Sequence, residues 1–86
     1  MLEIKLNGIN GAGKYAIVSP EDYPMVARHS WYYREGYALA KISGKEIRMH
    51  RYIMDVHDPD LIVDHKDRNR LNNTRESLRV FNYIQN

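Results

Sequence analysis

The chain has 86 residues, which suits one small domain, and a domain of this size buries only about 60–65% of its unfolded surface. Hydrophobic residues make up 43% and charged residues 28%, as in globular proteins, and no apolar run approaches the roughly 20 residues that span a bilayer. The absence of cysteine excludes disulfides and thiolate zinc sites, so we expect a cytoplasmic protein. A net charge of +2 is too small by itself to indicate a nucleic-acid partner.

The N-terminal segment alternates apolar and polar residues from Leu2 to Leu6, which predicts a half-buried strand. Tyr15–Val18 reads as a second strand, and the segment 8–14 between them carries turn signals typical of a hairpin. This segment also has the glycine and lysine spacing of a phosphate-binding P-loop. However, Tyr15 stands where that loop needs a serine or threonine for magnesium, so we favour the hairpin.

The next segment begins with helix-start signals, because Ser19 precedes Pro20 and two acidic residues. We expect a short helix that ends near His29. Strands are then predicted at 31–34, 37–42 and 46–49, separated by turns at Glu35-Gly36 and Ser43-Gly44. The aromatic residues of these strands are expected to build the core, and stacking on exposed bases is the alternative; they are Trp31, Tyr32, Tyr33 and Tyr37.

The remaining residues predict a helix at 50–56, an apolar strand at 61–63, a strand at 78–79 and a last short helix at 82–86. The fold class is therefore α+β. A small N-terminal antiparallel β-sheet with short helices, residues 1–49, leads into a C-terminal unit of residues 50–86. We expect the two parts to form a single domain.

Chemically competent residues gather in the segment 63–79. Asp64 and His65 follow the apolar strand directly, and carboxylate and amide oxygens suit a hard cation such as Mg²⁺. Histidine serves as a general base near neutral pH. Read alone, Asp64 is also compatible with a turn or cap. His50 reads as a packing residue more readily than a functional one, and nothing in the spacing of His50, His57 and His65 requires a zinc site.

Basic residues flank a group of acidic ones. The acidic group is Asp55, Asp58, Asp60 and Asp64. The basic residues before it are Lys41, Lys45, Arg48 and Arg51, and those after it are Lys66, Arg68, Arg70, Arg75 and Arg79. Two basic stretches around carboxylates favour a site that binds phosphates and a cation, and solvated surface charge is the alternative.

Several motifs in fixed order match a known family: Asp64-His65, Leu71-Asn72-Asn73, Leu78-Arg79, Gln85-Asn86 and the upstream His50-Arg51-Tyr52-Ile53-Met54. The N-terminal segments Ala16-Ile17-Val18 and Trp31-Tyr32 also recur in such proteins. The chain resembles the HNH homing-type endonucleases in the form widespread in phages, over most of its length. That resemblance implies a C-terminal ββα-metal motif and a phage- or mobile-element-encoded protein acting inside the host cell.

The resemblance also implies a function and a set of roles. The function is a metal-dependent endonuclease that hydrolyses or nicks phosphodiester bonds, with duplex DNA as its partner. His65 would be the general base, and Asp64 and Asn86 would bind one Mg²⁺ or Mn²⁺ ion. Asn73 would brace the loop of the site. DNA contacts would come from Arg51, Lys66, Arg68, Arg70, Arg75 and Arg79.

One family position departs from the pattern, because Ser77 stands where the middle asparagine is expected. That asparagine is thought to hold the loop that aims the histidine, and a serine hydroxyl replaces only part of its hydrogen bonding. The alternative function is therefore a DNA-binding module that kept the fold with weakened catalysis. A third possibility is a role on RNA.

Overall fold

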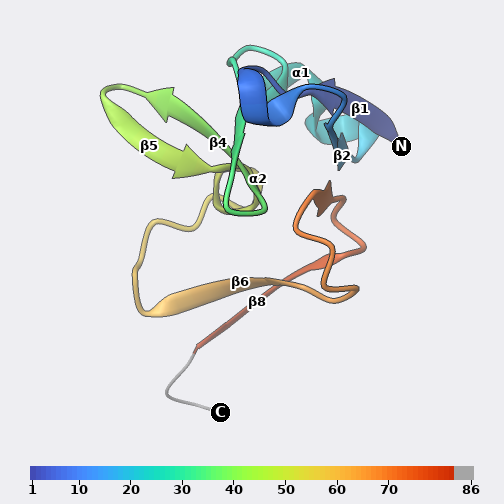
Figure 1. Ribbon diagram of the computed structural model, residues 1–86. Helices are drawn as coiled ribbons and strands as arrows, with labels where there is room; N and C mark the ends of the chain where they lie inside the picture. The colour runs from blue at the N-terminus through green and yellow to red at the C-terminus, as the bar shows by residue number, and fades with distance from the viewer. Residues whose placement is uncertain (83–86) are drawn as a thin grey trace.

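The computed structural model describes residues 1–82 (Figure 1). Its strands are β1 (Leu2–Lys5), β2 (Tyr15–Val18), β3 (Tyr32–Arg34), β4 (Tyr37–Ile42), β5 (Lys45–Arg48), β6 (Leu61–His65), β7 (Asn72–Asn73) and β8 (Leu78–Asn82). Its helices are the 3₁₀ turns η1 (Ile9–Gly11) and η2 (Pro20–Asp22) and the α-helices α1 (Tyr23–Val26) and α2 (Met49–Met54). This composition confirms the α+β class.

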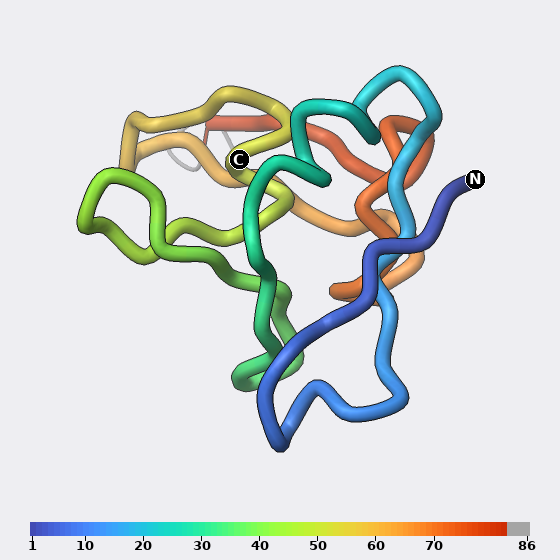
Figure 2. The backbone as a smooth tube through the Cα atoms, turned by 90° about the horizontal axis from the view of Figure 1, so that it is seen from above, coloured from blue at the N-terminus to red at the C-terminus, as the bar shows by residue number. Residues whose placement is uncertain are grey.

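The first sheet joins the two ends of the sequence. Strands β1 and β2 form the predicted antiparallel hairpin around η1, but β2 also pairs in parallel with β7, with Ile17 opposite Asn72. The amide of Ile17 donates to the carbonyl of Leu71 at 2.7 Å. In Figure 2 the segment near residue 72 runs beside the β2 region. The strand pairs within residues 1–49 are antiparallel as predicted, but they belong to two sheets, and the asparagine pair of the C-terminal unit adds a parallel strand to the first.

The second and third sheets follow the predicted strands more closely. β3, β4 and β5 form an antiparallel sheet, and β6 pairs antiparallel with β8 in a separate ladder (Figure 1). Asn82 is the last residue of β8, so the predicted helix does not begin there. The rest of that helix, with Gln85 and Asn86, lies outside the described residues.

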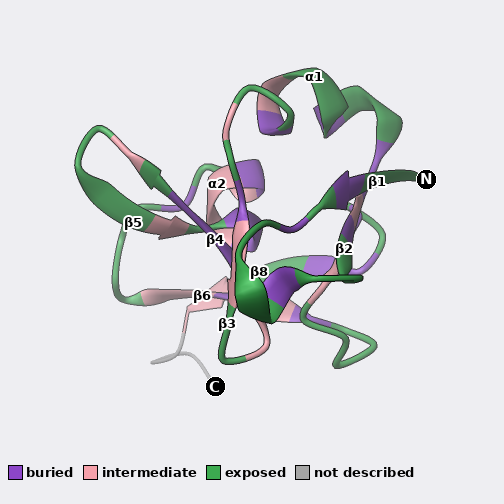
Figure 3. Cartoon of the chain, turned by 45° about the horizontal axis from the view of Figure 1, so that its top comes forward, coloured by how far each residue is buried: buried purple, intermediate pink, exposed green. Residues whose placement is uncertain are grey.

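The core draws on every sheet, and α2 lies at its centre with contacts to β4, β5, β6 and β7 (Figure 3). Trp31 is buried as expected, and its indole Nε1 donates to the carbonyl of Val26 at 2.7 Å. Tyr32 is half-buried and outside the core, and its hydroxyl donates to Glu46. The helix predicted after Ser19 is shorter than expected, because α1 ends at Val26.

No helix within residues 1–82 combines the length and apolar character that crossing a membrane requires.

Candidate active site

Asp64 and His65 are the last two residues of β6, opposite Arg79 and Leu78 of β8. Successive side chains on a strand point to opposite faces, and here His65 is buried whereas Asp64 is half-exposed. Both nevertheless line one hollow of about 270 Å³ at the end of the strand. The other residues that line it are Tyr37, Val63, Arg68 and Arg70. The sequence pair thus reaches a common space with two arginines.

The imidazole of His65 is held by Asn73. Its Nε2 lies 2.7 Å from Oδ1 of Asn73, a buried residue that β7 fixes against β2. An amide oxygen only accepts hydrogen bonds, so Nε2 carries the proton of the neutral ring. Nδ1 then has the lone pair and is the nitrogen left to face the hollow. This arrangement suits Nδ1 for accepting a proton from water.

His50 packs beneath this ring. The centroids of His50 and His65 are 4.9 Å apart, and His50 stacks on Tyr37 at 5.4 Å with 18° between the planes. Burial, and next the nearby His65, lower the pKa of His50 from 6.5 to about 3. His50 is therefore neutral at physiological pH. Its burial agrees with the packing interpretation from the sequence.

Asp64 is paired with Arg79, whose Nη2 lies 2.8 Å from Oδ2 and whose Nε lies 3.2 Å from the same oxygen. The hydrogen bonds from Arg79, and next the backbone amide of His65, hold the pKa of Asp64 below its ordinary value. An ionised carboxylate at the rim of the hollow has the charge and oxygen chemistry that Mg²⁺ prefers.

The other metal residue predicted from the sequence, Asn86, lies outside the described residues. Among residues 1–82 no three histidine or acidic side chains gather closely enough to hold a metal ion. His57 is paired with Asp55 at 2.8 Å, on the exposed loop after α2.

The loop after His65 is organised around Asp67, which the sequence analysis did not single out. Its carboxylate accepts from the amide of Asn69 at 3.0 Å, from Nδ2 of Asn72 at 2.7 Å and from Oγ of Ser77 at 3.0 Å. These contacts, the amide of Asn69 first, lower the pKa of Asp67. The signal that could have identified it is the Asp-x-Asn spacing, which is typical of an aspartate that accepts from the amide two residues later.

Ser77 therefore closes the loop through Asp67. Its backbone carbonyl also accepts from the amide of Lys66 at 2.8 Å, and its own amide donates to Thr74. The His65 ring instead makes its hydrogen bond with Asn73, whose Oδ1 accepts from Nε2. The sequence predicts Ser77 to be a weakened brace of the histidine, whereas in the structure it acts indirectly, through Asp67 and through the amide of Lys66, the residue next to His65.

The basic residues differ in how far they are already engaged. Arg51 donates to the carbonyls of Leu61 and Asp58 at 3.0 and 2.8 Å and thereby holds the loop before β6. Lys66 and Arg68 are exposed, and Arg70 packs over Tyr37.

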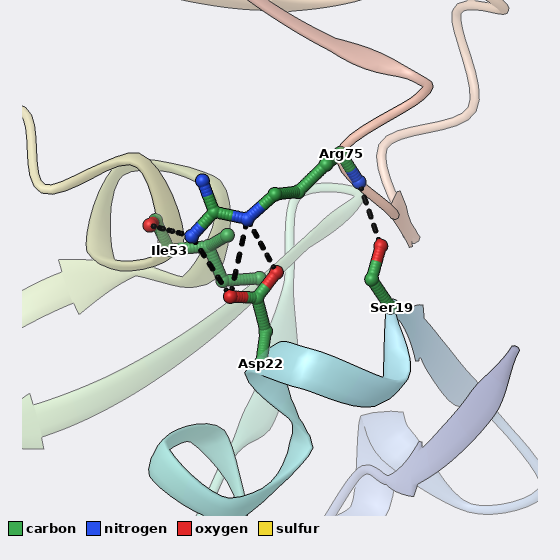
Figure 4. A network of polar contacts seen from close by, with 4 residues as sticks. All are labelled: Ser19, Asp22, Ile53 and Arg75. Carbon is green, nitrogen blue, oxygen red and sulfur yellow. Dashed lines mark hydrogen bonds and ion pairs between the residues drawn. The ribbon is translucent and has the colours of Figure 1, made fainter.

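Arg75 lies in a network with the N-terminal half of the chain (Figure 4). Its Nε and Nη2 bind the carboxylate of Asp22 at 2.8 to 3.2 Å, and its amide donates to Oγ of Ser19 at 2.9 Å. The carboxylate occupies the Nε–Nη2 edge of the guanidinium, so this edge is not available to a phosphate. We therefore leave Arg75 out of the candidate DNA interface, although the sequence placed it there.

Comparison with known proteins gives two related sequences. An HNH endonuclease of Acanthamoeba polyphaga mimivirus is 37% identical over 82 residues, which cover 88% of this chain and 43% of the relative. An H-N-H endonuclease of Escherichia phage T5 is 40% identical over 67 residues, which cover 65% of this chain and 34% of that relative. The chain belongs to the HNH endonuclease family.

This HNH chain spans less than half the length of both curated relatives. No family model matches its sequence. No solved structure matches it either. The family assignment therefore rests on these two relatives and agrees with the motif order read from the sequence.

Proposed function

We propose that this chain is a divalent-metal-dependent endonuclease that hydrolyses phosphodiester bonds of duplex DNA. The observation that carries the proposal is the His65 ring, which is fixed through Nε2 by Asn73 beside an ionised Asp64 and two arginines. The names of the relatives support the nuclease class. The substrate, the metal requirement and the roles below are our proposals.

In this mechanism Nδ1 of His65 accepts a proton from a water molecule as the water oxygen attacks phosphorus and the bond from phosphorus to the 3′ oxygen breaks. Asn73 keeps the ring in the tautomer that leaves Nδ1 unprotonated. His50 and Tyr37 pack around the ring and restrict its rotation. A general base held in this way typically contributes about 10²–10⁴-fold to the rate.

Asp64, together with Asn86, would hold one Mg²⁺ or Mn²⁺ ion. Such an ion supplies positive charge that stabilises the phosphate under attack and the departing oxygen. The carboxylate fits this role because it is ionised and reaches the hollow that His65 lines. Mg²⁺ is commonly bound through one or two carboxylates and keeps several waters, so a site with few protein ligands is chemically reasonable.

The backbone of DNA would be bound by the remaining basic residues of the candidate interface. Lys66 and Arg68 are exposed in the loop beside the hollow, and Arg70 lines it. If these three residues contact phosphates, the logarithm of the affinity falls against the logarithm of the salt concentration with a slope of roughly −3.

A plasmid-nicking assay with Mg²⁺ or Mn²⁺ tests the proposal. His65→Ala should lower the single-turnover cleavage rate by at least about 10²-fold and leave DNA affinity nearly unchanged. His57→Ala is the matched control, because His57 is an exposed histidine paired with Asp55 away from the hollow. An RNA duplex of the same sequence tests the role on RNA. Equal rates for the parent and His65→Ala would contradict the assignment of the base.

A second function, a DNA-binding module with weakened catalysis, is favoured by Ser77 in place of the family asparagine. The same assay separates the two, because a binding module holds the plasmid in a gel-shift experiment without cutting it. The bond from Ser77 to Asp67 closes the loop in this chain, which supports the enzyme as the first choice.

A further inference from the structure

Arg70 is an exposed side chain that is nevertheless held in place. Its Nη1 donates to the backbone carbonyl of Glu35 at 3.0 Å, across 35 positions of sequence. Its guanidinium carbon lies 4.7 Å from the ring centroid of Tyr37, a cation–π contact. Glu35 lies in the connection from β3 to β4, and Tyr37 is the first residue of β4. An arginine of the C-terminal loop is therefore fixed by the N-terminal half of the protein.

Gly36 makes room for this contact. Its φ is +87°, in the left-handed region that glycine adopts without strain. A Cβ at this position would lie 3.1 Å from both Cδ and Nη1 of Arg70, which is closer than ordinary van der Waals contact allows. The turn thus accepts glycine for two reasons, its backbone and its neighbour.

Arg70 and Tyr37 line the same hollow as Asp64 and His65. Arg68 lines it too, but its backbone has a φ of 62° and its side chain makes no hydrogen bond within residues 1–82. The other arginines of the segment, Arg75 and Arg79, are paired with carboxylates. Of the described arginines that line this hollow, Arg70 is the one whose guanidinium is already oriented.

We propose that Arg70 is a catalytic residue that contacts the phosphate under attack, held there by the turn between β3 and β4. This inference rests on the proposed nuclease function. As the water oxygen bonds to phosphorus and the 3′ oxygen departs, negative charge grows on the phosphate oxygens while the proton of the water passes to His65. A donor fixed in advance stabilises that charge without reorganising, whereas Arg68 must first be ordered. Arg70 itself transfers no proton.

The consequence is a division between rate and affinity. Arg70→Ala should lower the single-turnover rate at saturating protein by about 10²-fold, as the loss of one preoriented donor does, and should weaken DNA binding only as much as the loss of one phosphate contact does. Arg70→Lys should remain slow, because an ammonium keeps the charge but not the planar fork. Arg68→Ala, at a residue proposed to bind DNA, should weaken binding. Arg28→Ala is the matched control, because Arg28 is an exposed arginine that does not line the hollow, and it should change neither the rate nor the affinity appreciably.

A second pair of variants tests the turn. Gly36→Ala should slow cleavage about tenfold, because the Arg70 side chain must yield by a few tenths of an ångström to the added Cβ, and a displacement of about 1 Å costs on the order of 10²-fold. Gly44→Ala is its control: Gly44 has a φ of +79° in the turn between β4 and β5, with nothing within 4 Å of the added Cβ. The two substitutions impose similar backbone strain, but only the first displaces Arg70. Thermal unfolding of all variants shows whether each remains folded. If Gly36→Ala does not fold, the rate of Arg70→Lys tests the role of the oriented guanidinium instead.

Two results would overturn the inference. One is an Arg70→Ala variant that cuts as fast as the parent once it is saturated with DNA. The other is equal slowing by Gly36→Ala and Gly44→Ala in folded proteins. A parent chain that binds DNA and cuts none of it contradicts the nuclease proposal itself, and this inference with it. The first two results leave that function standing.

Discussion

The segment from Asp64 to Arg79 contains two arginines that are each paired with an aspartate, and the two pairs have the same chemistry in different surroundings. Arg75 binds Asp22, whose side chain is 4% exposed, at the contact with the N-terminal half. Arg79 binds Asp64, whose side chain is 42% exposed, at the hollow. Both pairs have an Nη2–Oδ distance of 2.8 Å, so distance alone does not distinguish them.

The difference lies in what remains when one partner is removed. A buried carboxylate that loses its arginine stays in the interior without compensation, and this is costly. A half-exposed carboxylate is solvated instead, so an exposed pair contributes little and can be exchanged for another cation. The Arg75–Asp22 pair therefore anchors one side of the segment, whereas the Arg79–Asp64 pair on the other side can exchange its cation. The chemistry we propose takes place at the exchangeable pair.

The largest effect on stability is expected for Arg75→Ala. It leaves Asp22 buried without its ion pair and removes the contact with the carbonyl of Ile53. We expect a loss of about 3 kcal/mol in the free energy of unfolding, measured by urea denaturation. Arg68→Ala, an exposed arginine with no such pair, should change it by less than about 0.5 kcal/mol. If both variants lost a similar free energy of unfolding, the buried Arg75–Asp22 pair would not be the anchor that we infer.

The pH dependence of stability tests whether His50 is buried beneath the hollow. The folded pKa of His50, about 3, is below its ordinary 6.5, so between these values the unfolded chain binds a proton that the folded chain does not. The contribution of neutral His50 to the free energy of unfolding is therefore fully present above about pH 6.5. It falls as the pH is lowered towards 3, by up to about 1.4 kcal/mol per pH unit.

We would measure urea denaturation of the parent and of His50→Phe at pH 7 and at pH 5. The difference in pH dependence between the two proteins gives the contribution of His50. The lowered pKa values of Asp64 and Asp67 also make stability fall with acid, but they act equally in both proteins. His57→Gln, a change at an exposed histidine, should leave the pH dependence as in the parent. A parent and a His50→Phe variant with the same pH dependence would show that His50 titrates normally.

The smallest change in stability is expected for Arg79→Ala, less than about 1 kcal/mol. Its effect should appear in metal binding, because Asp64 loses the cation that occupies Oδ2. We expect Mn²⁺ to bind more tightly in calorimetric titration, and Asp64→Ala to lose binding. Unchanged Mn²⁺ affinity in both variants would place the metal elsewhere.

Much of the fold follows from local patterns. The alternation around Ile4 and the turn signals at residues 8–14 predict the β1–β2 hairpin, and the apolar run before Asp64 predicts β6. The family motifs brought Asp64, His65 and Asn73 together as candidates. The structure places Asn73 on the His65 ring, a contact that the spacing alone does not specify.

What the sequence could not give are pairings between distant residues. Arg75 and Asp22 are 53 positions apart, and an arginine in a basic stretch looks the same whether it faces solvent or a buried carboxylate. The parallel pairing of β7 with β2 involves only Asn72 and Asn73, polar residues with low strand propensity. The contacts that hold Arg70 depend on the shape of the turn at Gly36, 34 positions away, and no local sequence pattern predicts them.

The parallel pairing of β2 with β7 also bears on how the protein folds. Asn73 is positioned by Val18, its partner in the register, so the residue that holds His65 is ordered only when the N-terminal hairpin is in place. Closing the loop between β2 and β7 costs conformational entropy before the contact stabilises the chain, so such nonlocal pairings form late. Assembly of the histidine site is thus a late event that reports on completion of the whole fold, rather than a property that residues 50–82 acquire on their own.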